Sequence, residues 1–176
     1  MDLRVARTDE LTQPTLSVLR RLFEAAFDND FGDENWEHAL GGIHFMLEDG
    51  DSILAHASVV PRELETRERM WRTGFVEAVA ARPDVQRSGH GTTVMRAAGD
   101  HIREAYELGS LSTGENAFYE RLGWLTWRGD TGVRTEQGTD MTPWEKGAVM
   151  VLLTDATALI DLTGPITCEW RPGDVW

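Results

Sequence analysis

The sequence contains few of the residues that build disulfide networks or membrane spans. Cys168 is the only cysteine, so no internal disulfide can form, and a lone thiol is usually a small buried apolar side chain. No stretch approaches the roughly 18 apolar residues of a transmembrane helix. The start MDLRVARTDE is charged from its second residue and lacks the apolar segment of a signal peptide. We therefore expect a cytoplasmic protein without a membrane partner.

Basic residues are also scarce, because 17 Lys and Arg face 30 Asp and Glu, which leaves a net charge of −13 and a pI near 4.7. Such a surface repels nucleic acid and attracts small cations. An acidic surface that simply keeps the protein soluble is the other interpretation. The 176 residues, 41% of them hydrophobic, suit one folded domain over residues 1–176.

Hydrophobic periodicity predicts strands that alternate with helices. The predicted strands are 3–7, 43–49, 53–61, 70–81 and 108–112, with further candidates at 125–135, 147–154 and 166–170. The predicted helices are 15–27, 89–105 and a short one ending at Gly123, with one turn near 35–40 and a loop over 136–147. His44 and His56 could face each other across the 43–61 hairpin. A third ligand is missing, so we expect no metal site.

The turn after strand 70–81 is suited to holding phosphate. The segment Gln86-Arg87-Ser88-Gly89-His90-Gly91 runs directly into a predicted helix, whose first amide N–H groups lack partners within the helix. Glycine at positions 89 and 91 lets the backbone approach a bulky anion, and Thr92 adds a hydroxyl donor. Taken alone, this spacing fits a structurally capped helix equally well.

Two motifs in the expected order resemble those of the GNAT superfamily of acetyl-coenzyme A dependent N-acetyltransferases. The first is the 86–91 loop, and the second is NAFYERLGW at 116–124. The segments DFGDENWEHALGGIH, TGFVEAVAARPD, YELGSLS and CEWRPGDVW further resemble the aminoglycoside 2′-N-acetyltransferases. The chain departs from that branch at Asn35, where the branch has an acid, and between Ser112 and Tyr119, where it is shorter. Those departures leave a different acceptor open.

The resemblance implies an α/β GNAT fold, with a mixed, strongly bent sheet flanked by helices and splayed between its two central parallel strands. It also implies acetyl-coenzyme A as cofactor. The pantetheine arm of the cofactor would pair with the main chain of Val79, Ala80 and Ala81. Its diphosphate would lie on the turn formed by Gln86, Arg87, Ser88, Gly89, His90, Gly91 and Thr92. Glu77 would act as general base, unless it is an ordinary outward-facing residue of the sheet. Tyr119 would protonate the leaving thiolate, unless it is a core tyrosine that anchors its helix.

The resemblance also implies an acceptor pocket. Its residues would be Asp30, Glu77, Ala78, Ser112, Trp144, Glu145, Asp174 and Trp176. The terminal carboxylate of Trp176 would bind an ammonium group if its indole packs down, whereas chain ends are commonly frayed. We expect acetyl transfer to the 2′-amine of a polycationic aminoglycoside by direct attack, without metal and without an acyl-enzyme on Cys168. The alternatives are another amine (a cell-wall amino sugar, a polyamine or a peptide N-terminus) or a non-catalytic protein that binds the drug or acetyl-coenzyme A. A homodimer is expected by resemblance.

Overall fold

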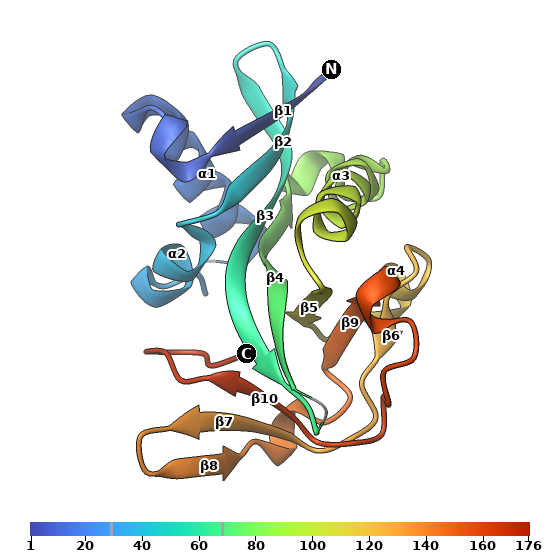
Figure 1. The fold of residues 1–176 in the computed structure, drawn as a ribbon. Coiled ribbons are helices and arrows are strands. Elements are labelled where there is room, and N and C mark those ends of the chain that lie inside the picture. The colour runs from blue at the N-terminus through green and yellow to red at the C-terminus, as the bar shows by residue number, and fades with distance from the viewer. Residues whose placement is uncertain (29, 68) are drawn as a thin grey trace. The chain divides into compact units, whose positions relative to one another are not determined.

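The computed structural model describes residues 1–28, 30–67 and 69–176, and its contacts divide them into two compact units. Unit 1 comprises Met1–Val60 and Val76–Asp100, and unit 2 comprises Pro61–Phe75 and His101–Trp176. Three long elements contribute residues to both units. They are the strands β3 (Ser52–Glu65) and β4 (Met70–Ala81) and the helix α3 (His90–Ala105), shown in Figure 1.

Unit 1 is built on an antiparallel arrangement of three strands. Strand β1 (Asp2–Arg7) pairs with β2 (Ile43–Asp49), and β2 pairs with β3, so that the hairpin predicted from the sequence is confirmed. The helices α1 (Gln13–Ala26) and α2 (Asp33–Ala39) lie between β1 and β2 in the chain. The side chain of Thr12 caps α1 by accepting a hydrogen bond from the Thr15 amide at 3.4 Å, and Pro14 occupies the first turn.

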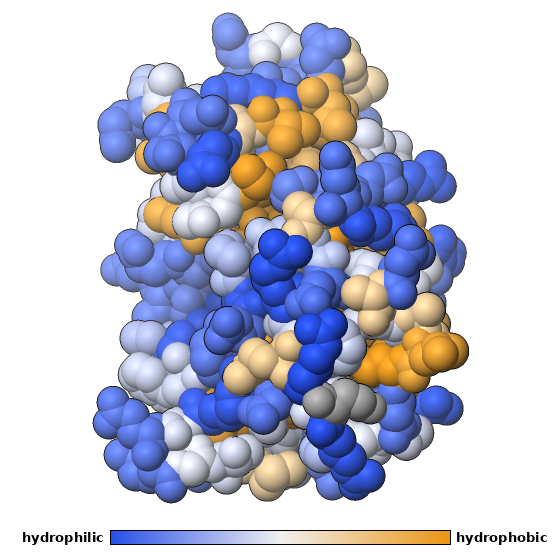
Figure 2. All heavy atoms as spheres, viewed as in Figure 1, coloured by the Kyte–Doolittle hydropathy of each residue, from blue (hydrophilic) through white to orange (hydrophobic). Residues whose placement is uncertain are grey.

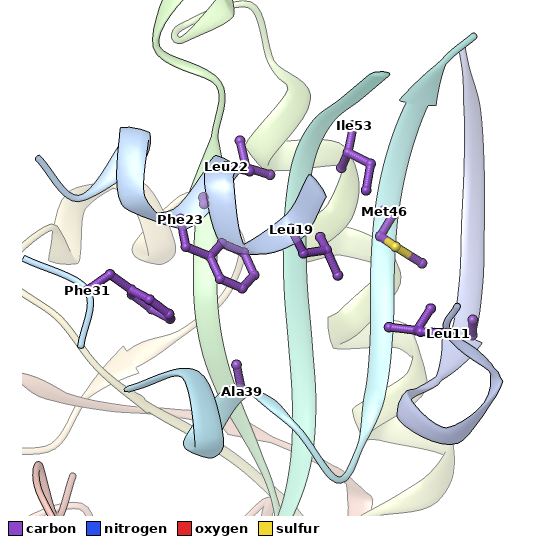
Figure 3. Close-up of a cluster of buried hydrophobic side chains, with 10 residues drawn as sticks. Leu11, Leu19, Leu22, Phe23, Phe31, Ala39, Met46 and Ile53 are labelled. Carbon is purple, nitrogen blue, oxygen red and sulfur yellow. The ribbon is translucent and has the colours of Figure 1, made fainter. Parts of the chain in front are cut away.

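The core of unit 1 lies between α1, α2 and one face of these strands. Figure 3 shows Leu19, Leu22 and Phe23 of α1 facing the strands, where Met46 and Ile53 project toward them. The two phenylalanine rings Phe23 and Phe31 lie 4.9 Å apart. Helix α3 lies on the other side of the strands (Figures 1 and 3). Because both faces are covered, residues 53–60 of β3 are buried without alternation.

Unit 2 contains the remaining strands and the short helix α4 (Asn116–Glu120). Strand β5 (Leu108–Ser112) runs parallel to β4, and β9 (Val149–Leu153) runs antiparallel to β5, with β6 (Leu125–Thr126) at its edge. Strand β10 (Ile166–Glu169) is antiparallel to β3 and parallel to β7 (Thr131–Thr135), which forms a hairpin with β8 (Gly138–Met141). The strand order is β6-β9-β5-β4-β3-β10-β7-β8, and β2 and β1 continue from β3 off this path. Short 3-10 turns occur in both units: η1 (Thr8–Glu10) and η2 (Pro83–Val85) in unit 1, and η3 (Pro143–Glu145) and η4 (Asp155–Thr157) in unit 2.

Three local predictions were wrong. The segment 136–147 is not only a loop, because it contains β8, whose four residues are all exposed. An edge strand with no buried face shows no apolar alternation, so the sequence pattern does not reveal it. The candidate 125–135 is split into β6 and β7, because buried Trp127 turns inward between them and its indole N–H donates to the Gly164 carbonyl at 2.9 Å. Helix α2 is longer than the single turn expected.

A mixed α/β sheet with flanking helices is confirmed. The face in Figure 2 is mostly hydrophilic, and a group of apolar side chains lies near β1, where Leu3 and Val5 are exposed. Among the residues that the structure describes, no helix is long and apolar enough to cross a bilayer.

Candidate functional site

The phosphate-binding turn predicted from the sequence lies in unit 1, between η2 and α3. Residues Gln86, Arg87, Ser88 and Gly89 are exposed, and the turn is entered through a bidentate pair of Arg82 with Asp84 at 2.6 and 2.9 Å. The guanidinium of Arg82 lowers the pKa of Asp84. These contacts fix the start of the turn, while its tip stays open to solvent.

Gly89 allows the chain to enter α3 from this turn. Its φ is +85°, and a Cβ built on it would meet nothing within 4 Å, so glycine is needed for the backbone conformation and not for space. The first intrahelical bond runs from the Thr93 amide to the Gly89 carbonyl at 3.1 Å. The amides of His90, Gly91 and Thr92 therefore precede the helical ladder, at the positive end of the helix dipole. N–H donors at the exposed start of a helix are a suitable place for a phosphate group to bind.

Strand β4 is irregular next to Glu77. Ala78 has φ +48°, which is uncommon for a residue with a Cβ. The run from Glu77 to Val79 is half-buried instead of alternating, and buried Ala80 joins the core of unit 1. Two side chains of β3 hold this part of β4: Ser58 Oγ donates to the Glu77 carbonyl at 3.2 Å, and His56 Nδ1 lies 2.8 Å from the Ala78 carbonyl. The irregularity changes the direction of Glu77 and of the amides that follow it.

Four of the residues predicted to bind the acceptor lie in a network in unit 2. Ser112 Oγ, at the end of β5, donates to Glu145 Oε2 at 2.8 Å. Burial raises the pKa of Glu145, the Ser112 hydrogen bond opposes that shift, and the negative charge of Asp174 adds to it. The Trp176 amide donates to Asp174 Oδ1 at 3.4 Å. The half-buried Glu145 carboxylate is thus exposed to the charge of Asp174, an exposed residue, and an ammonium group would relieve their repulsion.

The C-terminus is ordered by its last side chain. Trp176 is 3% exposed, and its indole N–H donates to Thr142 Oγ1 at 3.0 Å. Arg62, which is also buried, donates from Nη1 to the Val175 carbonyl at 2.9 Å. The indole packs down, which is the condition set for a carboxylate held in place, and the frayed tail is not what the structure shows.

Tyr119 is buried in α4. Its ring meets Phe118 edge-on at 4.9 Å and Trp124 at 6.3 Å. Burial raises the pKa of Tyr119 to about 12, against the effect of a hydrogen bond with Thr113 and together with the charge of Glu115. The phenol therefore keeps its proton at neutral pH, as a proton donor must, and the same packing also anchors the helix.

The other predicted residues are less constrained. Trp144 is 71% exposed, and Asp30 is an exposed turn residue of unit 1 whose amide donates to the Phe27 carbonyl at 2.8 Å. Val79 and Ala81 are half-buried. Within residues 1–28, 30–67 and 69–176, no cluster of three or more His, Cys, Asp or Glu residues could hold a metal ion. Cys168 is buried, and burial raises its pKa to about 11, which suppresses the reactive thiolate.

Supporting residues were missed by sequence reasoning. Ser58 and His56 hold β4, whereas Thr142 and Arg62 hold the C-terminus. The hairpin pattern did bring His44 and His56 together. Nothing in it indicated that a carbonyl of β4 would be their partner.

Comparisons with known proteins identify the family and the fold. The model of the acetyltransferase (GNAT) domain family matches residues 7–126. The chain is 42% identical over 177 residues to an aminoglycoside 2′-N-acetyltransferase of Mycolicibacterium fortuitum, an alignment that covers 98% of this chain and 91% of the relative. Among solved structures it resembles the GNAT family N-acetyltransferase YhbS of Escherichia coli in complex with CoA, with a TM-score of 0.69, 16% identity and coverage of 98% and 93% of the two chains. A GNAT acetyltransferase of Brucella melitensis in complex with acetyl-CoA matches with a TM-score of 0.56, 16% identity and coverage of 84% and 94%.

Proposed function

The chain belongs to the GNAT family of acetyltransferases, and from that premise we propose that it acetylates the 2′-amine of an aminoglycoside with acetyl-coenzyme A as donor. The observation that carries the choice of acceptor is the 42% identity over nearly the full length to an enzyme named for that reaction. The fold alone would not carry it, because one fold serves many acceptors.

On the donor side, the open turn at Gly89 and the first-turn amides of α3 fit the diphosphate of acetyl-coenzyme A. When bound, this cosubstrate supplies a thioester whose acetyl carbon accepts the amine. We assign the main chain of Val79, Ala80 and Ala81 to the pantetheine arm, and an amide in this run to polarising the thioester carbonyl.

Proton transfer is assigned to two residues. Glu77 takes a proton from the acceptor ammonium, directly or through water, so that a neutral amine can attack. Tyr119 is the phenol whose proton the sulfur takes as the carbon–sulfur bond breaks, and it is protonated at neutral pH.

On the acceptor side, Glu145, Asp174 and the terminal carboxylate of Trp176 bind ammonium groups. Support comes from the raised pKa of Glu145, which reports burial and like charge without a cationic partner, and from the pinned indole of Trp176. An aminoglycoside carries several ammonium groups, and a cluster of fixed carboxylates both concentrates it and orients it.

The test is mass spectrometry of kanamycin B and kanamycin A after incubation with the protein and acetyl-coenzyme A. The two antibiotics differ only at the 2′ position, where kanamycin B has an amine and kanamycin A a hydroxyl. We expect one added acetyl group on kanamycin B, at the 2′-nitrogen by fragmentation, and none on kanamycin A. Equal modification of both would refute the 2′ assignment. Acetylation of only a polyamine, a cell-wall amino sugar or a peptide would establish another acceptor, and binding without transfer to any amine would establish a non-catalytic protein.

A further inference from the structure

Unit 1 contains a continuous chain of hydrogen bonds through two buried histidines, and the chain ends at the irregular part of β4. Thr8 Oγ1 lies 2.8 Å from His44 Nε2, His44 Nδ1 lies 2.9 Å from His56 Nε2, and His56 Nδ1 lies 2.8 Å from the Ala78 carbonyl oxygen. The two histidines are 1% and 0% exposed. The chain thus connects the segment after β1 with β2, β3 and β4.

The direction of every hydrogen bond in this chain is determined by its last member. A carbonyl oxygen can only accept, so His56 Nδ1 must carry a proton. Burial lowers the pKa of His56 to about 3, so the ring is neutral and its Nε2 must accept from His44 Nδ1.

The same reasoning extends to Thr8. Burial lowers the pKa of His44 to about 4, so its Nε2 can accept the hydroxyl proton of Thr8. The Gly42 carbonyl is a second acceptor for that proton, but it lies farther from Thr8 Oγ1, at 3.3 Å against 2.8 Å for His44 Nε2. Thr8 Oγ1 in turn accepts from the Gly41 amide at 2.9 Å. Each member therefore fixes the tautomer or rotamer of the next, from Gly41 to Ala78.

The position at which this chain ends is the reason for assigning it a role. Ala78 carries the positive φ of +48°, a conformation that persists only where the surroundings hold it. With His44 absent or turned, the proton of His56 could move to Nε2, and a lone pair of Nδ1 would then face the Ala78 carbonyl. The Ala78 carbonyl would lose its hydrogen bond from the side chain of His56.

We propose that His56, held in one tautomer by His44 and Thr8, is a positioning residue that keeps the β4 irregularity at Ala78 in the conformation that aims Glu77 and the amides of Val79 to Ala81 for acetyl transfer. The proposal rests on the proposed function, since it concerns the same residues. None of the three members touches the reacting atoms in this assignment, so each acts through the backbone of β4.

The first experiment measures the tautomers without using activity. Long-range 1H–15N correlation spectra of the whole protein at pH 7 should show both His44 and His56 as neutral rings protonated at Nδ1, the less common tautomer of free histidine. In His44→Phe, the His56 signal should move toward the form protonated at Nε2. A wild-type ring of either histidine protonated at Nε2 would overturn the proposal, whatever the enzyme acetylates.

The second experiment measures kcat and KM for acetyl-coenzyme A with kanamycin B. We expect His56→Phe and His44→Phe each to reduce kcat by about 10- to 100-fold, the effect of a small misplacement of reacting groups, with KM for acetyl-coenzyme A within about threefold of wild type. The double variant should lose little more than either single variant, because the members act as one unit. Additive losses, or equal changes of kcat and KM, would indicate a merely structural role and overturn the proposal.

A matched control and a mild variant keep the test decisive. Phe23→Leu removes an aromatic ring whose centroid lies 4.8 Å from that of the His56 ring, but it breaks none of the hydrogen bonds from Thr8 to Ala78. This variant should therefore lower the melting temperature and leave kcat nearly unchanged. If the phenylalanine variants do not fold, Thr8→Val removes only the half-buried outer hydroxyl and should still reduce kcat, whereas Thr8→Ser should restore it. A kcat for Thr8→Val equal to wild type would overturn the proposal. Wild-type protein with the expected tautomers but no acetyl transfer to any amine would instead refute the proposed function, and with it the role of the chain in acetyl transfer.

Discussion

The two units arrange polar groups in opposite ways. In unit 1 the groups from Thr8 to Ala78 are neutral, and each donor meets an acceptor. In unit 2, Glu145 and Asp174 carry charge of the same sign, and the pKa of Glu145 is raised. A satisfied neutral network rigidifies a fold, whereas close carboxylates destabilise it until a cation binds. The first arrangement holds backbone in place, and the second is suited to binding a ligand.

The largest effect is expected at Glu77, which precedes Ala78, the last member of the neutral hydrogen-bonded chain. Glu77→Gln keeps the size of the side chain but removes its basicity, so kcat should fall by about 100-fold or more. Steady-state kinetics with kanamycin B measures this, and Glu37→Gln, an exposed acid of α2 in the same unit, should have no effect. A Glu77→Gln enzyme with wild-type kcat would show that the acceptor loses its proton elsewhere.

A smaller effect, on binding and not on turnover, is expected in unit 2. Glu145→Gln removes one carboxylate charge but can still accept from Ser112, so KM for kanamycin B should rise by about 10- to 100-fold while KM for acetyl-coenzyme A stays constant. In the wild type, KM for the drug should fall as pH rises through the pKa of Glu145, which lies above the ordinary value of 4.5.

The control is Glu136→Gln, an exposed acid of the same unit that should leave both KM values unchanged. If it weakened drug binding as much as Glu145→Gln does, the general acidic surface would be responsible and not the cluster. The polar groups of unit 2 would then not form a specific binding site, in contrast to what the comparison of the two units proposes.

The neutral chain should also be visible in the pH dependence of stability. The pKa values of His44 and His56 lie at about 4 and about 3, below the ordinary 6.5, chiefly because of burial. Between pH 6.5 and these values the unfolded chain binds protons that the folded chain does not. The contribution of the two neutral histidines to the free energy of unfolding is therefore fully present above about pH 6.5. It falls as the pH is lowered toward 4, by at most about 1.4 kcal/mol per pH unit for each histidine.

Thermal melts from pH 7 to pH 4.5 measure this slope. The double variant His44→Gln/His56→Gln should melt at a lower temperature at pH 7 but show a shallower decline with acid, because its amides do not titrate. Parallel slopes would mean that the carboxylates alone account for the acid sensitivity.

The sequence predicted what depends on local pattern. The strand to Ala81, the turn at Gly89 and helix α3 follow one another in the chain, and their periodicity and turn residues identified them. It also predicted that His44 and His56 meet, because a hairpin register is set by its turn. The positive φ of Ala78 could not be predicted, since alanine has no preference for it and the bonds that hold it come from β3.

The burial of Trp176 was equally beyond the sequence. Its partner Thr142 lies 34 positions away, beside the edge strand β8 that shows no apolar pattern. The family resemblance placed Trp176 at the acceptor pocket but left open whether its indole packs down, and the structure supplied the residue that holds it.

The smallest effect is expected from Trp176→Phe, which tests whether the terminal carboxylate must be held in position or only has to be present. Trp176→Phe keeps an aromatic ring and the carboxylate but removes the indole N–H that donates to Thr142 Oγ1 at 3.0 Å. Loss of one neutral hydrogen bond is worth about 1 kcal/mol, so KM for kanamycin B should rise about fivefold, with kcat and KM for acetyl-coenzyme A unchanged. Trp170→Phe is the matched control, because Trp170 lies in the same segment and is 58% exposed. If both variants behave as wild type while Glu145→Gln weakens binding, the ammonium groups are bound by the Glu145 cluster alone, and the C-terminus contributes stability instead of recognition.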